Sequence, residues 1–409
     1  MIRRKFISQV VKTALLSPAA LAITKLHAAQ NSRHLVETPG KRAEYLAKIL
    51  KLICTDLGPH PVGSPECEKA MYIIKNEMHM ALPKVELDPF LFDRWMLSDK
   101  PRLSIGDTVI EAFPRIETAG TPSDGITGVV VKLKTKELPS YGIADLSSGN
   151  VMAYISPYSG TARPTLARGD EMRQKPTVNI GKQDVQLIES AIQQKTPAHL
   201  YIPVTIISDT ETSNIVGTLP GKSKDEILFL AHYDTVYSTP GANDNTASVA
   251  IMLMLAHELS GTVPEKTLRF VATTSEERGD YMGATKYAER RKREDTMNNI
   301  KYVINFDSGT WGSNIEIWSE DEELKKMISD IDSDLSVNGT PILMDRSGFT
   351  MDSKPFRESG ARAVYVESNS PDKVYLWHRP IDTPGNVQEF IVEINFLLFS
   401  EYIKRLQKL

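Results

Sequence analysis

The sequence predicts an α/β fold: a mostly parallel twisted sheet flanked by helices, with a mostly β inserted domain. From Ile206 onward, short runs of apolar and β-branched residues alternate with longer segments of helical spacing. This alternation is typical of a parallel sheet wrapped by helices. Residues 94–204 differ, because they consist of short alternating stretches broken by Gly, Pro and Ser, which is the pattern of a β domain.

The elements can be placed in order along the chain. Two helices, 43–54 and 67–82, flank a turn rich in Gly and Pro. The insert contains short apolar strands such as 128–133 and 150–155. After the insert, strands and helices are expected to alternate at 227–231, 247–259, 268–273, 283–293, 302–306, 322–335, 363–366 and 387–406.

Residues 1–28 have the composition of a signal peptide. They hold five basic residues and no acidic one around a mildly apolar run, and small residues follow at Ala28-Ala29. Arg3 and Arg4 ahead of Phe6 are typical of a twin-arginine signal, which exports folded proteins; an ordinary secretory signal is the alternative. The sequence therefore predicts a periplasmic or secreted protein.

Composition argues against two classes of partner. The chain of 409 residues is 41% hydrophobic and 24% charged, which is ordinary for a globular protein. Its net charge is −4, and about −9 once the five basic residues of the signal are removed. We therefore expect neither nucleic acid nor an anionic membrane as a partner. Cys54 and Cys67 could form one disulfide in an oxidising compartment or remain buried thiols, and the sequence leaves both open.

Polar side chains of the types that bind zinc follow several predicted strands. A pair of zinc ions needs a bridging carboxylate and a small set of His, Asp and Glu ligands. Asp244 stands in a loop that opens a helix, where it could bridge, and Asp234 is placed to orient the imidazole of His232. Adjacent acids such as Glu276 and Glu277 can point in different directions from a loop, one to a metal and one to a water molecule. Each signal is weak alone, and so are Asp307 at a strand end and His378 in a loop.

The order of these motifs carries more information than any one of them. The chain reads His-x-Asp, Gly-Ala-Asn-Asp-Asn, Ser-Glu-Glu, Ile-Asn-Phe-Asp and then His-x-Pro-x-Asp-Thr. This series resembles the co-catalytic di-zinc aminopeptidase family, whose relatives include glutamate carboxypeptidases and glutaminyl cyclases. By that resemblance residues 41–93 and 205–409 form the zinc peptidase domain, and residues 94–204 form a protease-associated-like insert.

The resemblance implies two zinc ions and a role for each residue of the site. His232 and Asp307 hold one zinc ion, Glu277 and His378 hold the other, and Asp244 bridges them. Glu276 is the general base that serves a metal-bound hydroxide, and peptides are the substrates, cleaved at the amino-terminal peptide bond. The resemblance also implies a cis peptide between Asp244 and Asn245.

The chain departs from the family at two places. The residue before the last ligand is commonly Tyr, whereas here it is Trp377, so either its indole N–H or the hydroxyl of Tyr375 is left to stabilise an oxyanion. A histidine common near the fourth strand is absent from 351–356. The side-chain pocket cannot be placed, although 346–351 are candidates for it.

Two other functions stay open at this point. A glutaminyl-peptide cyclotransferase would use one zinc ion and would not need the full ligand set, and an inactive peptidase-fold binding protein would have lost ligands. Because the set is complete, the sequence favours the peptidase.

Overall fold

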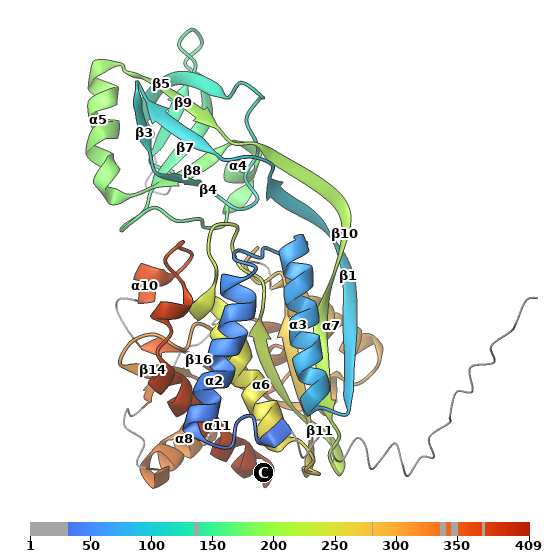
Figure 1. Cartoon of the computed structure of the whole chain (residues 1–409). Helices are drawn as coiled ribbons and strands as arrows, with labels where there is room; N and C mark the ends of the chain where they lie inside the picture. Colours follow the sequence, from blue (N-terminus) through green and yellow to red (C-terminus); the bar gives the residue numbers. More distant parts are fainter. Residues whose placement is uncertain (1–31, 135–138, 280, 336–340, 345–350, 370–372) are drawn as a thin grey trace, which may run out of the picture.

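The fold was analysed in a computed structural model that describes residues 32–409 apart from 135–138, 280, 336–340, 345–350 and 370–372 (Figure 1). The predicted signal peptide, 1–28, therefore lies outside the described residues. Two sheets organise the rest of the chain, one in a larger α/β unit and one in a smaller, mostly β unit above it in the view of Figure 1. In the described part of the chain, no helix combines the length and the apolar character that crossing a membrane requires.

The larger sheet has a parallel centre. Its eight strands are, in spatial order, β1 (Lys84–Leu97), β10 (Val204–Leu219), β12 (Lys266–Thr273), β11 (Ser223–His232), β13 (Ile300–Phe306), β16 (Arg362–Asn369), β14 (Asn314–Trp318) and β15 (Ile342–Met344). The run β12–β11–β13–β16 pairs in parallel, and β14 pairs with β15 in parallel. The pairings β1–β10, β10–β12 and β14–β16 are antiparallel. The α/β class is confirmed, and the sheet is parallel at its centre and mixed towards its edges.

Helices cover both faces of this sheet, and for that reason β11 is buried from Glu226 to His232. The helices described in this unit are α2 (Pro39–Leu50), α3 (Pro65–Ala81), α6 (Ala247–Leu259), α7 (Met282–Arg293), α8 (Glu322–Leu335), α9 (Lys354–Arg357), α10 (Lys373–Leu376) and α11 (Glu389–Leu406). α6 is apolar around most of its circumference and is buried from Ala247 to His257, as expected for the central helix of a core. Its side chains share one apolar cluster with those of α2, α3, α8 and α11, whereas α7 and α9 pack in a second cluster.

The first two helices begin earlier than predicted, for a local reason. Pro39 and Pro65 occupy the first helical position, and the side chains of Thr38 and Ser64 accept hydrogen bonds from backbone N–H groups of the first turn. A proline is favoured at that position because the N–H it lacks has no partner within the helix.

The smaller unit is built on a second sheet of eight strands. They are, in spatial order, β3 (Thr108–Ile110), β2 (Arg102–Ile105), β9 (Pro197–Tyr201), β5 (Ile126–Lys132), β6 (Tyr141–Ala144), β7 (Val151–Pro157), β8 (Thr177–Ile180) and β4 (Ala112–Pro114). Helix α5 (Val185–Gln194), which the strand pattern did not predict, packs its apolar side against this sheet, and the short helix α4 (Gly169–Gln174) lies close by.

Strands β1 and β10 join the two units as one long antiparallel ribbon (Figure 1). Their pairing runs from Lys84 opposite Thr218 to Leu97 opposite Val204. The ribbon therefore continues through the positions where the sequence pattern changes, near 94 and 204.

Cys54 and Cys67 do not form a disulfide. Both are buried free thiols, and the Cys67 Sγ lies 3.9 Å from the Thr274 hydroxyl oxygen. Burial raises the pKa of each thiol to about 12, so neither is a reactive thiolate near neutral pH.

Candidate metal centre

The predicted site residues meet at the carboxyl ends of the parallel strands. His232 is the last residue of β11, and Glu276 and Glu277 lie in the loop after β12. Asp307 directly follows β13, and Asp244 lies in the turn that opens α6. His378 follows the short helix α10. Strands that run in parallel end at the same edge of a sheet, which explains how residues 146 positions apart come together.

Two groups of three side chains have the geometry of metal ligands. One is His232, Asp244 and Asp307, and the other is Asp244, Glu277 and His378; within each group one ligand atom per residue lies within 4.8 Å of the others. All five residues are buried. Asp244 belongs to both groups, which is the property of a bridging ligand.

The two oxygens of Asp244 face different histidines. Its Oδ1 lies 3.3 Å from the Nε2 of His232, and its Oδ2 lies 3.7 Å from the Nε2 of His378. Burial would raise the pKa of Asp244, but the hydrogen bond to His232 and the charge of the two imidazoles outweigh it, and the pKa is lowered. The carboxylate is therefore ionised, as a metal ligand must be.

The remaining ligand candidates complete the two groups. The Nε2 of His232 lies 3.6 Å from the Oδ1 of Asp307, and the Nε2 of His378 lies 2.8 Å from the Oε2 of Glu277. The other oxygen of Glu277, Oε1, is buried and has no hydrogen-bond partner among the described residues. A buried carboxylate oxygen without a partner is costly. A cation would satisfy it, and a set of imidazoles and carboxylates is one that zinc accepts.

Glu276 lies beside this set with a perturbed acidity. Burial, assisted by the negative charge of Asp307 and Glu277, raises its pKa well above the ordinary value, and the charge of His232 opposes the rise. A carboxyl group whose pKa is raised is suited to take up and return a proton.

Asp234 contacts both His232 and the loop that carries the two glutamates. Its side-chain Oδ1 is 3.8 Å from the Nδ1 of His232, whereas its backbone carbonyl accepts a hydrogen bond from that nitrogen at 3.1 Å. The carboxylate also accepts the backbone N–H of Glu276 at 3.2 Å and that of Glu277 at 3.4 Å. That the Asp234 carboxylate orients His232 stays a prediction, and the same carboxylate holds the loop that carries the two glutamates.

Two residues that support the site, Asp382 and Asn245, were not predicted from the sequence to have a functional role. The Asp382 carboxylate is fully buried and accepts the backbone N–H groups of Asn243 and Asp244. The Asn245 side chain donates to the Phe306 carbonyl at 3.0 Å and accepts from the Ser308 N–H at 3.1 Å, so it fixes the backbone on both sides of Asp307. Asp382 is the aspartate of the His-x-Pro-x-Asp-Thr motif, and this position is the sequence signal that could have identified it as a functional residue. The expected cis peptide between Asp244 and Asn245 is confirmed.

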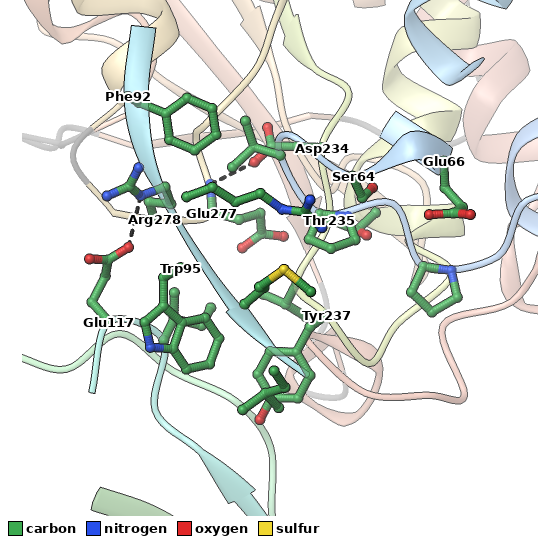
Figure 2. A pocket seen from close by; sticks show the side chains of 18 of the residues that line it. Ser64, Glu66, Phe92, Trp95, Glu117, Asp234, Thr235, Tyr237, Glu277 and Arg278 are labelled. Carbon is green, nitrogen blue, oxygen red and sulfur yellow. Dashed lines mark hydrogen bonds and ion pairs between the residues drawn. The ribbon is translucent and has the colours of Figure 1, made fainter. Parts of the chain in front are cut away.

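A pocket of about 390 Å³ opens next to this centre (Figure 2). It lies between β1, the turn at 59–66 and the loops that follow β11 and β12, and Asp234 and Glu277 form part of its wall. Aromatic side chains, among them Trp95 and Tyr237, line it, and their rings lie 5.9 Å apart. The ion pair of Arg278 with Glu117, at 2.9 Å, closes another side.

Only part of the mouth of the site lies among the residues that the structure describes. Of the pocket candidates at 346–351, only Met351 is among the described residues. The indole of Trp377 lies against the imidazole of His378, with ring centroids 4.0 Å apart. The side chain of Tyr375 is more than half exposed, and Arg379 stacks over its ring.

Comparisons with known proteins agree with this fold. Residues 214–400 match peptidase family M28. The chain is 23% identical to aminopeptidase YwaD of Bacillus subtilis (strain 168) over 92% of this chain and 87% of that protein, and 26% identical to human carboxypeptidase Q over 66% of each. The structure of BSAP, a zinc aminopeptidase from Bacillus subtilis, superposes with a TM-score of 0.70 at 18% identity and covers 89% of this chain and 95% of that one. At this identity the superposition shows the shared fold.

Proposed function

We propose, from the premise that residues 214–400 belong to peptidase family M28, that this chain is an exported zinc-dependent aminopeptidase. Its reaction would be hydrolysis of the amino-terminal bond of peptides. The observation that carries the proposal is the pair of ligand groups joined through Asp244. The names of the relatives, an aminopeptidase among them, support the same reaction class.

The proposed ligand assignment follows the two groups. His232 and Asp307 hold one zinc ion, Glu277 and His378 hold the other, and Asp244 is shared. Zinc ions bound at such sites supply Lewis acidity, which polarises the substrate carbonyl and activates a water molecule for attack.

The residues of the chain then supply proton transfer and alignment. Glu276 takes the proton of the attacking water and delivers it to the leaving amine, and its raised pKa suits both steps. Asp234 holds the backbone of Glu276, so that the base keeps its direction. Trp377 lies beside His378, where its indole N–H is a candidate donor to the oxyanion that forms when the carbonyl oxygen takes up negative charge.

The aromatic pocket beside Glu277 is the proposed place for a substrate side chain. Apolar pockets of this size, about 390 Å³, take up side chains of peptides and small ligands.

Residues 94–204 are proposed to form a protease-associated-like insert that covers this side of the site. Residues 1–28 are proposed to direct the chain out of the cytoplasm, on the composition of that segment alone.

Metal analysis combined with a substrate panel tests the proposal. We expect about two zinc ions per chain, hydrolysis of amino-acid amides and free dipeptides, and no hydrolysis of the same dipeptides with a blocked amino terminus. One zinc ion together with cyclisation of amino-terminal glutamine would favour the cyclotransferase instead. No bound metal and no turnover would favour a binding protein and refute the proposal.

A further inference from the structure

The inserted unit reaches the proposed metal ligand His378 directly. The Nδ1 of His378 lies 3.0 Å from the backbone carbonyl oxygen of Pro164, a residue of the loop between β7 and α4. A carbonyl oxygen can only accept, so Nδ1 carries the proton and donates it. In the neutral ring the other nitrogen, Nε2, then carries the free electron pair, and it faces Glu277 at 2.8 Å and Asp244 at 3.7 Å.

The neighbouring Arg163 holds the backbone next to the same histidine. One of its terminal nitrogens donates to the carbonyl oxygen of Trp377 at 3.0 Å. The guanidinium lies over the ring of Tyr158 at 4.6 Å and over that of Trp377 at 5.8 Å. His378 has a left-handed backbone, with φ of 59°, which is uncommon outside glycine. A hydrogen bond to the preceding carbonyl helps to fix this conformation.

Arg163 is unusual for a buried arginine because no carboxylate among the described residues pairs with its charge. It is only 2% exposed, yet among the residues that the structure describes no ion pair joins it to a carboxylate, and its Nε has no hydrogen-bond partner. A buried cation is costly without a paired anion. An arginine that served only to stabilise the insert would be expected to form an ion pair with a residue of the insert. Arg163 instead donates its hydrogen bond to Trp377, in the segment that carries His378.

The loop that carries both contacts is fixed to the sheet of the insert. Asn179, in β8, donates from Nδ2 to the Arg163 carbonyl oxygen at 2.9 Å and to the Thr165 hydroxyl oxygen at 2.8 Å. Arg115, directly after β4, donates to the Oδ1 of Asn179 at 2.9 Å. The loop is therefore a rigid support for Pro164 and Arg163.

We propose that Arg163 and the Pro164 carbonyl are positioning residues for His378, so that the inserted unit sets how tightly the ion of Glu277 and His378 is bound. This inference rests on the proposed function, because it takes His378 as a zinc ligand. Groups that hydrogen-bond to metal-bound histidines fix the tautomer and orientation of the ring, and their loss typically weakens metal binding by about 10- to 100-fold.

The test measures zinc binding in the full chain carrying Arg163→Gln, with Arg168→Gln as the matched control. Arg168 lies in the same loop but is exposed, so its replacement makes the same chemical change away from His378. Titration against a chelator should show one zinc ion bound about as in the unsubstituted chain and the other bound at least about tenfold more weakly. Activity of Arg163→Gln should fall at limiting zinc and return in excess zinc, which a loss of fold would not permit.

A second variant keeps the inference testable if Arg163→Gln does not fold. Tyr158 is only partly buried, and Tyr158→Ala removes the ring beneath the guanidinium while leaving Arg163 in place. It should weaken the same zinc ion by a smaller factor. If the unsubstituted chain binds two zinc ions and both Arg163→Gln and Tyr158→Ala bind them with unchanged affinity, this inference is wrong and the proposed function stands. If the unsubstituted chain binds no zinc, the proposed function fails and the inference fails with it.

Discussion

The Asp382 carboxylate holds the backbone of Asp244: the Asp244 N–H donates to its Oδ2 at 3.0 Å, and the adjacent Asn243 N–H donates to its Oδ1 at 2.8 Å. Each oxygen of the buried Asp382 carboxylate therefore holds one backbone N–H of the turn that carries Asp244, the ligand candidate shared by both groups. Burial raises the pKa of Asp382 to about 7, although both amides favour its ionised form. Asp382 lies four residues after His378, so the same motif supplies one ligand candidate and the support of another.

Asp382→Asn should weaken zinc binding more than it weakens the fold. An amide has one oxygen to accept a hydrogen bond, so one of the two N–H groups loses its partner and the turn of Asp244 loosens. We expect at least about tenfold lower zinc affinity, in the range typical of groups that support metal ligands. Chelator competition measures this, and thermal unfolding of the zinc-free proteins is the control. Equal zinc affinity in the two proteins would show that Asp382 does not position Asp244.

Much of the centre could be predicted because each ligand candidate stands at a recognisable place in the chain. His232 ends a strand, Asp307 follows one, and the Glu276-Glu277 pair follows another, so the strand pattern and the parallel topology already bring them to one edge of the sheet. The fold class follows from the same alternation of strands and helices.

The parts that escaped prediction depend on contacts between distant segments. Asp382 meets Asn243 across 139 positions, and Pro164 meets His378 across 214. No periodic pattern encodes such pairs. The short strand β14 was missed for a different reason: with five residues in a stretch rich in Gly and Ser, it is too brief for a pattern to be distinguished.

Zinc affinity should fall as the pH falls below about 7. In the metal-free protein, burial raises the pKa of Glu277 to about 7. Burial would lower the pKa of His378, but the carboxylate of Glu277 outweighs it and the pKa is raised. Protons compete with zinc for these groups, so binding is weaker where they are protonated. One competing proton gives a change of about tenfold per pH unit. Chelator competition from about pH 5 to about pH 8 measures the slope, and an affinity that is constant over this range would contradict the assignment.

Glu276→Ala should retain both zinc ions and lose turnover. Glu276 is proposed as the base and belongs to neither ligand group, so its removal leaves the five proposed ligands in place. The loss of a general base typically costs about 10² to 10⁴ in rate. Turnover of an amino-acid amide, together with elemental analysis of the same sample, measures both quantities. Retained turnover would remove Glu276 from the mechanism.

Glu277→Ala should show the opposite pattern, and the comparison with Asp244→Ala separates an ordinary ligand from a shared one. Without Glu277, one ion keeps only His378 and Asp244, so we expect zinc occupancy to fall towards one per chain. Asp244→Ala should reduce occupancy further, because both groups contain Asp244 and two cations would face each other with less negative charge between them. Elemental analysis of the two variants beside Glu276→Ala measures the order. If Glu276→Ala loses zinc while Glu277→Ala keeps two ions, the roles assigned to the adjacent glutamates are reversed.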